Sequence, residues 1–138
     1  MNKVFPVTAL IVTIFLLSIN NNVYGAIGGY SVNLVHDQWE TLVDTQLQIT
    51  ADLTNNQDRA QPFAYLVQIQ DENGVTVSLS WITGSLGPGQ FMNPSQSWTP
   101  TSLGKYTAQI FVWESVDNPD ALSEPLTINI NVVETRNT

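Results

Sequence analysis

The chain has 138 residues, with four Lys and Arg against 12 Asp and Glu, a formal net charge of −8, a single histidine and no cysteine. A surface this acidic repels nucleic acid and anionic membranes, because phosphates and acidic headgroups need cationic partners. Without cysteine the fold must rely on packing rather than disulfides, and the copper site of an electron-transfer sandwich, which needs two histidines and a cysteine, is excluded. We therefore expect no nucleic-acid partner.

Residues 1–25 have the order of a secretory signal peptide. Met1–Lys3 is a short positive start, Val4–Ile19 is an uncharged, mostly apolar run, and compact residues follow before Ala26. A run of about 16 residues is short for a membrane span, which needs roughly 20. The sequence therefore predicts a signal peptide at 1–25, one secreted domain at 26–138 associated with the cell surface, and no membrane span in the mature chain.

The first strands of the domain are predicted from alternation of apolar and polar residues. Tyr30–Val35 alternates loosely, and His36–Glu40 breaks the pattern. From Val43 to Leu53 apolar and polar residues alternate strictly. That alternation is typical of a strand with one face in the core and the other in water.

A hairpin is predicted next. Gln61–Gln70 and Val75–Trp81 alternate on either side of Asp71–Gly74, which ends in Asn-Gly and can take the positive φ angles of a tight turn. Glycine and proline recur through Gly84–Gln90, which excludes a helix or a central strand there. Proline also interrupts Phe91–Trp98, which predicts a short strand at a sheet edge.

The stretch Trp98–Trp113 is predicted to organise the fold. It has a turn at Thr99–Gly104 and a strand at Lys105–Trp113 that is apolar on both faces, as expected of a strand in the middle of a sheet. Tyr106, two residues after Gly104, is placed as in the tyrosine corner of immunoglobulin-like sandwiches, where a tyrosine hydroxyl bonds back to the preceding turn.

The last elements are a loop at Glu114–Pro125 and a strand at Leu126–Val132. Seven strands separated by turns, with no helical period after residue 25, predict an all-β fold. More closely, they predict a seven-stranded antiparallel immunoglobulin-like β-sandwich.

Several motifs resemble a known family. They are TADLTNNQDRAQPFAYLVQIQD at 50–71, SLGPGQ at 85–90, SWTP at 97–100 and GKYTAQIFVW at 104–113. Together they resemble the cell-adhesion-related (CARDB-like) domains of bacteria and archaea. Those domains are immunoglobulin- or fibronectin-III-like modules of secreted proteins, and the likeness is particular to large exported proteins of ammonia-oxidising archaea. The proline–glycine, tryptophan and tyrosine series is also similar to the intracellular proteinase inhibitor family. Because these are turn and core residues, the resemblance implies a fold more than an activity.

The sequence does not predict an enzyme. His36 is the single histidine, and no nucleophile motif accompanies it. A catalytic set needs a nucleophile, a base and a group that orients the base. We interpret His36 as a polar loop residue.

Acidic and amide side chains gather in the loop after the central strand. They are Glu114, Asp117, Asn118, Asp120 and Glu124. Oxygen ligands on a loop suit Ca²⁺, but the spacing matches no known calcium loop, and these residue types are also the usual turn formers. A solvated loop is favoured and no cofactor is expected; calcium held by Asp117, Asp120 and Glu124 is the weaker alternative.

Aromatic residues offer the other candidate contact surface. Phe111 and Trp113 fall on the strand face opposite Tyr106, Ala108 and Ile110, so an exposed apolar patch is a hypothesis. The four tryptophans could also form a platform for sugar rings, although core packing is favoured for most of them. The predicted contact residues are Phe111, Trp113, Glu114, Asp117 and Asp120.

Three functions follow as hypotheses. The first is a secreted, non-enzymatic module for adhesion or cell-envelope interaction, with a protein or polysaccharide of the cell surface as partner. The second is a subunit of an extracellular fibre or surface layer, oligomerising by strand addition. The third is a secreted protease inhibitor that uses Ser85–Gln90 or Glu114–Glu124 as its reactive segment.

Overall fold

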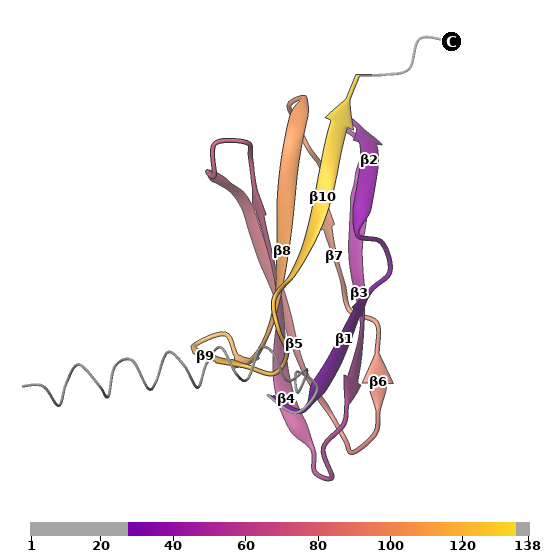
Figure 1. The fold of residues 1–138 in the computed structure, drawn as a ribbon, viewed down its shortest axis with the longest axis vertical. Coiled ribbons are helices and arrows are strands. Elements are labelled where there is room, and N and C mark those ends of the chain that lie inside the picture. Colours follow the sequence, from indigo (N-terminus) through magenta and orange to yellow (C-terminus); the bar gives the residue numbers. More distant parts are fainter. Residues whose placement is uncertain (1–27, 135–138) are drawn as a thin grey trace, which may run out of the picture.

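The structure is a computed structural model that describes residues 28–134, and these residues form two β-sheets with no helix among them (Figure 1). The all-β fold is therefore confirmed. The signal peptide predicted at 1–25 lies outside the described residues. Within 28–134 there is accordingly no helix long and apolar enough to cross a membrane.

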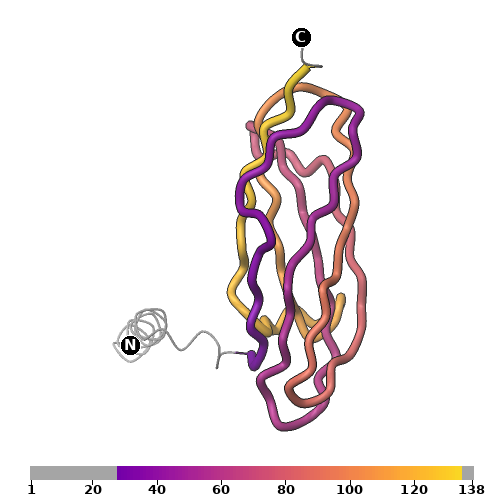
Figure 2. Tube along the Cα trace, turned by 90° about the vertical axis from the view of Figure 1, so that its right-hand side faces the viewer, coloured from indigo at the N-terminus to yellow at the C-terminus, as the bar shows by residue number. Residues whose placement is uncertain are grey.

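The smaller sheet is built around one central strand. Its members are β1 (Tyr30–Leu34), β3 (Leu47–Asn55), β6 (Phe91–Met92) and β7 (Ser95–Trp98). β3 pairs with β1 on one side and with β6 and β7 on the other. Figure 2 shows this sheet from the front, running from indigo β1 across β3 to the salmon segment of β6 and β7.

The larger sheet has six strands. Five of them lie in the order β2 (Gln38–Leu42), β10 (Leu126–Val133), β8 (Gly104–Ser115), β4 (Gln61–Gln70) and β5 (Thr76–Leu86). The sixth, β9 (Asn118–Ala121), pairs with the end of β8. β8 is central, as its two apolar faces predict.

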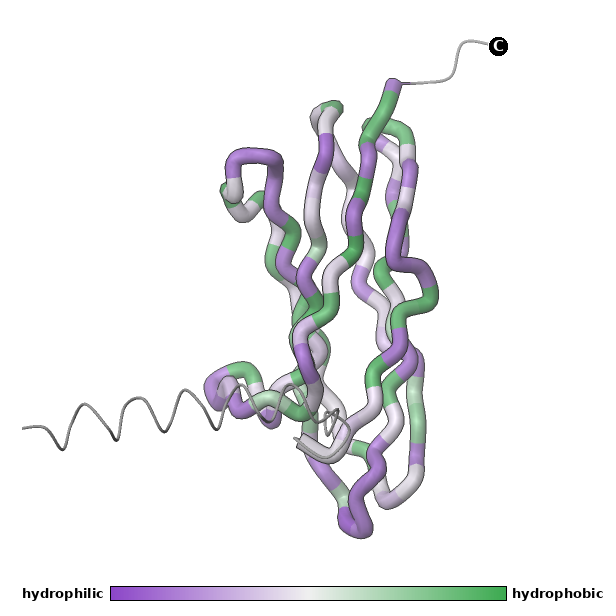
Figure 3. Tube along the Cα trace, viewed as in Figure 1, coloured by the Kyte–Doolittle hydropathy of each residue, from purple (hydrophilic) through white to green (hydrophobic). Residues whose placement is uncertain are grey.

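The core lies between the two sheets and comes mainly from four strands. β3, β8 and β10 bury every second side chain, β4 buries all five side chains from Phe63 to Val67, and the alternation along β10 is visible in Figure 3. Inter-sheet hydrogen bonds add to the apolar packing: the Tyr65 hydroxyl donates to the Ile49 carbonyl across the core (3.0 Å). This leaves the outer face of each sheet as the surface available for contacts.

The β4–β5 hairpin and the edge position of the proline-interrupted strand are both confirmed. The Asp71 N–H donates to the Val75 carbonyl (2.9 Å), and Gly74 has a φ of 78°. β6 and β7 lie at the edge of the smaller sheet, separated by Asn93 and Pro94.

The tyrosine corner is present. The Tyr106 hydroxyl donates to the Ser102 carbonyl (2.9 Å), and Gly104 between them has a φ of 138°, which favours glycine. Trp98 packs edge-on against the Tyr106 ring with 5.0 Å between ring centroids. The corner therefore ties the turn to the start of the central strand.

We expect Tyr106→Phe to lower the free energy of unfolding by about 1 kcal/mol, because it removes one hydrogen bond and keeps the ring against Trp98. Urea denaturation measures the change. A variant as stable as the wild type would show that the hydroxyl does not fasten the corner.

The prediction of seven antiparallel strands is wrong in number and in one pairing. The described residues hold ten strands, because the predicted edge strand is split into β6 and β7 and because β2 and β9 are not predicted. β2 pairs parallel to β10. β2 is not predicted because its partner β10 is distant in sequence and because apolar and polar residues alternate only weakly along β2. From the sequence, His36–Glu40 is therefore interpreted as a break between strands.

Three boundaries also differ. β3 begins at Leu47 rather than Val43, because Asp44 has a φ of 63° and its N–H donates to Pro100. β5 continues to Leu86, and Gly84 leaves room there for the Phe63 ring. Most of the predicted loop at 114–125 is the β8–β9 hairpin, whose proline is tolerated on an edge strand.

Candidate binding surface

The outer face of the larger sheet carries a cluster of apolar side chains, which we call the aromatic face. It consists of Leu66, Leu79, Trp81, Phe111 and Trp113. Directly opposed residues of antiparallel strands share a sheet face. Leu66 on β4 lies opposite Trp81 on one side and Phe111 on the other, so these three side chains form one row across three strands.

Period-two alternation places the aromatic face outside. Ile110 and Val112 on β8 point into the core, so Phe111 and Trp113 between them point away from it. Trp81 is 49% exposed, whereas Leu66 in the middle of the row is only 5% exposed. The Phe111 and Trp113 rings are 5.7 Å apart between centroids and tilted by 48°. The result is an apolar platform in which the Phe111 and Trp113 rings support each other and Trp81 stands exposed.

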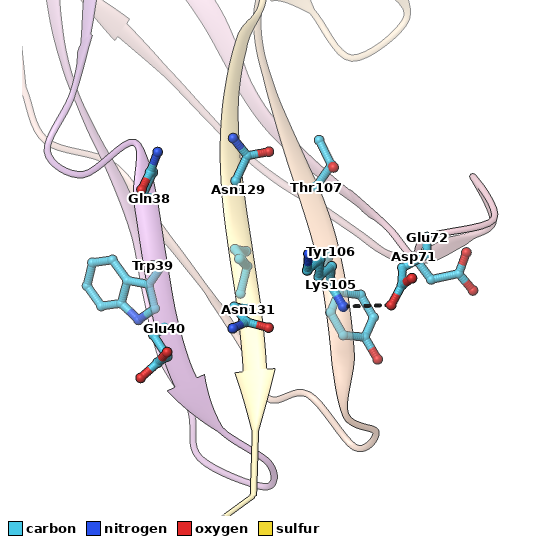
Figure 4. A pocket seen from close by; sticks show the side chains of 11 residues that line it. Gln38, Trp39, Glu40, Asp71, Glu72, Lys105, Tyr106, Thr107, Asn129 and Asn131 are labelled. Atoms are coloured by element: carbon cyan, nitrogen blue, oxygen red, sulfur yellow. Dashed lines mark hydrogen bonds between the residues drawn. The ribbon is translucent and has the colours of Figure 1, made fainter.

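The other half of the same face is polar. One row across the sheet is Gln38, Asn129, Thr107 and Gln70, and a second row is Glu40, Asn131 and Lys105. All of them except Gln70 border an open cleft of about 800 Å³ that the β4–β5 turn closes on one side (Figure 4). There the backbone N–H of Lys105 donates to Glu72 Oε1 (3.1 Å). Amide side chains both donate and accept hydrogen bonds, so this half can hold neutral polar groups.

The predicted acidic contact residues lie at the far end of β8. Ser115 Oγ donates to Asp117 Oδ1 (2.7 Å), and this hydrogen bond, together with a backbone one, lowers the pKa of the Asp117 carboxyl. Asn118 Oδ1 accepts from the Asp120 N–H (3.1 Å). Glu114 and Asp120 border a cleft that also includes Arg59. Of these acids, Asp117 is therefore engaged through its carboxylate in the β8–β9 turn, at the end of the strand that carries Phe111 and Trp113.

The calcium alternative gains no support from the geometry. Across residues 28–134 no three His, Cys, Asp or Glu side chains are grouped so that they could hold a metal ion. Asp117, Asp120 and Glu124 are thus not brought together as a ligand set, and calcium binding stays a prediction.

His36 and the segment Ser85–Gln90 are also placed by the structure. The His36 ring packs edge-on against Trp39, with centroids 4.6 Å apart. Ser85–Gln90 is anchored at both ends to one residue: the Asn55 side chain donates to the Leu86 carbonyl (2.9 Å), and the Asn55 N–H donates to Gln90 (2.9 Å).

Sequence reasoning finds Phe111 and Trp113 but misses the rest of the aromatic face. The alternation over Val75–Trp81 predicts a half-buried strand, yet Val75, Val77, Leu79 and Trp81 are all exposed. Core packing is the predicted role of most tryptophans, and it holds for Trp39 and Trp98, which pack against the core. The one local sign in the sequence is a pair of serines at alternate positions of β5, Ser78 and Ser80, which make the inner face of the strand less apolar there.

Comparison with protein-family models gives no match, and comparison with curated proteins gives none either. Solved structures do match. The crystal structure of the CARDB domain of the PF1109 protein from Pyrococcus furiosus, which was determined with di-metal ions, is 23% identical. The match covers 77% of this chain and 94% of that one, with a TM-score of 0.55. The solution structure of the same domain is 24% identical over 76% and 94%, with a TM-score of 0.58.

Parts of larger enzymes share the fold as well. A β-glucosidase from Listeria innocua is 14% identical with a TM-score of 0.55, over 77% of this chain but only 16% of the enzyme. A family 123 glycoside hydrolase from Clostridium perfringens is 9% identical with a TM-score of 0.56, over 78% of this chain and 28% of the enzyme. At these identities the likeness concerns the fold alone. The chain thus has the immunoglobulin-like sandwich fold of the CARDB domain.

Proposed function

We propose that the protein is an exported, non-enzymatic module of the cell surface that binds a partner on the outer face of its larger sheet. The observation that carries the proposal is the aromatic face. A half-exposed tryptophan on β5 lies on the same sheet face as a phenylalanine and a second tryptophan on β8, with β4 between the two strands, and contiguous exposed apolar groups mark contact sites.

The chemistry of this face favours an uncharged polysaccharide of the cell envelope over a protein. The C–H face of a sugar ring is apolar and packs on aromatic rings, while its hydroxyls need donors and acceptors. Aromatic rings and amide rows adjoin on this one sheet face and supply both. Arg59 and Lys105 are the only Lys or Arg in residues 28–134, so a strongly anionic partner has little to pair with.

The direct test compares Phe111→Ser with Phe91→Ser in binding to purified envelope polysaccharide and to envelope protein. Phe91 is 68% exposed on the smaller sheet, so the control removes an equal side chain from another surface. We expect Phe111→Ser to weaken binding on the order of tenfold, as for the centre of a contact surface, and Phe91→Ser to leave it unchanged. Thermal unfolding of both variants checks that they remain folded.

Equal binding by wild type and Phe111→Ser would exclude the outer face as the site. Binding to envelope protein but not to polysaccharide, weakened by Phe111→Ser, would confirm the aromatic face as the site and identify the partner as a protein.

A further inference from the structure

Three strands on one side of the sandwich contribute no charged residue. Between Glu72 and Lys105 the sequence contains no Asp, Glu, Lys, Arg or His, although the whole chain has a net charge of −8. This stretch forms β5, β6 and β7, and each of these strands lies at an edge of its sheet. We call the surface made by these three strands the uncharged side.

The main element of the uncharged side is β5, the longest edge strand of the two sheets. It has 11 residues, against five each for β1 and β2. It pairs with β4 on one side and with no other strand of the described residues on its other side. Alternate backbone N–H and C=O groups of β5 therefore point outwards, available to another strand.

Proteins normally protect such an edge with a charge, a proline, a bulge or a short strand. β5 has no charge and no proline. Its one irregularity lies near the hairpin, opposite Ile69 and Gln70, and from Ser78 to Leu86 the register with β4 is regular. β2 at the opposite edge is short and carries Glu40. The longest edge strand therefore has none of these protections from Ser78 to Leu86.

Exposed apolar side chains accompany these free backbone groups. They are Val77, Leu79, Trp81 and Ile82 on β5 and Phe91 on β6. Loss of charged residues together with exposed aromatic side chains is the composition that distinguishes the centre of a protein–protein interface from the rest of a surface.

We propose that two copies of this chain pair through β5, antiparallel about a two-fold axis, to form one continuous sheet across a dimer. The charge distribution favours a second copy as the occupant: two strongly acidic chains repel each other least where neither contributes a charged side chain, and the strands of the uncharged side contribute none. A two-fold contact uses the same surface on both partners, so the assembly closes as a dimer rather than growing into a fibre. β1 is already paired with β3 of its own chain, so it is not a free strand that could be added to the sheet of another copy.

The proposal goes beyond the proposed function and does not rest on it, since its test measures mass and not binding to the envelope. Sedimentation equilibrium of the purified protein is compared for wild type, Thr83→Lys and Thr127→Lys. Both threonines are exposed on the outer face of the larger sheet, Thr83 on β5 and Thr127 on β10. Both substitutions reduce the net negative charge equally, so general repulsion between copies falls by the same amount.

We expect a monomer–dimer equilibrium for the wild type. Thr83→Lys should raise the dissociation constant on the order of tenfold, because a lysine on an edge strand opposes its pairing with another strand. Thr127→Lys lies on β10, away from the pairing edge, and should not weaken the dimer. In the wild type, amide hydrogen exchange of β5 should also slow as protein concentration rises. A monomer at all concentrations, open-ended growth, or equal weakening by both variants would overturn the proposal.

Discussion

Replacing Asn55 by aspartate is expected to lower the free energy of unfolding by about 3–5 kcal/mol, because it leaves a buried charge without a partner. Asn55 ends β3 and is completely buried. Its Nδ2 lies within hydrogen-bond distance of three carbonyl oxygens, those of Arg59 (2.8 Å), Leu86 (2.9 Å) and Gly87 (3.1 Å). A carboxylate oxygen in that position would face the same carbonyls with no hydrogen to donate.

The neighbouring Asn56 supplies the control. Its exposed side chain donates to Ser31 Oγ, so Asn56→Asp makes the same chemical change at the surface and should cost less than about 0.5 kcal/mol. Guanidinium denaturation of the two variants measures the difference. The difference in stability between Asn55→Asp and Asn56→Asp should become smaller at acid pH, where the carboxyl introduced by Asn55→Asp is neutral and can donate one hydrogen bond. Equal stability of the two variants at neutral pH would show that the buried Asn55 amide does not hold the turn at Arg59 against the segment at Leu86 and Gly87.

Stability is expected to fall steeply as the pH rises from 10 towards 12, through two buried tyrosines. Burial raises the pKa of Tyr30 from 10.0 to about 12, and burial also raises the pKa of Tyr65. Because the unfolded chain loses these protons first, their contribution is complete below pH 10 and is lost as the pH passes through the folded-state values. Urea midpoints at successive pH values measure the fall.

The double variant Tyr30→Phe/Tyr65→Phe tests the cause. It removes the hydrogen bonds to the Gln61 carbonyl (2.6 Å) and the Ile49 carbonyl (3.0 Å), so it should be less stable at neutral pH. Its stability should nevertheless decline less between pH 10 and 12 than that of the wild type. Parallel declines in the two proteins would assign the alkaline loss to other groups.

Local sequence chemistry is enough to predict much of the fold. Asn73–Gly74 fixes the β4–β5 turn, Gly104 and Tyr106 fix the corner, and the two apolar faces of β8 fix its central position. The elements that escape prediction depend on distant partners. β2 forms because it pairs in parallel with β10. Asp44 does not belong to a strand, because its backbone N–H donates to the Pro100 carbonyl.

The candidate surface is predictable only in part for the same reason. Period two places Phe111 and Trp113 on one face, but it does not say whether a second layer covers that face. The structure shows that Leu66 and Trp81 extend the row and that no other strand of the described residues covers it. That Trp81 is exposed follows from β5 lying at an edge, which is a property of the strand order that the strand's own sequence signals only through Ser78 and Ser80.

The central claim is that the aromatic face is open in the free protein and covered by its partner. The most direct measurement is acrylamide quenching of tryptophan fluorescence with and without envelope polysaccharide, in the wild type and in Trp81→Phe and Trp113→Phe to assign the signal. We predict an accessible Trp81 and a partly accessible Trp113 in the free protein, both shielded on binding. Tryptophans at these two positions that are shielded in the free monomer, or that stay accessible in the bound protein, would contradict the account.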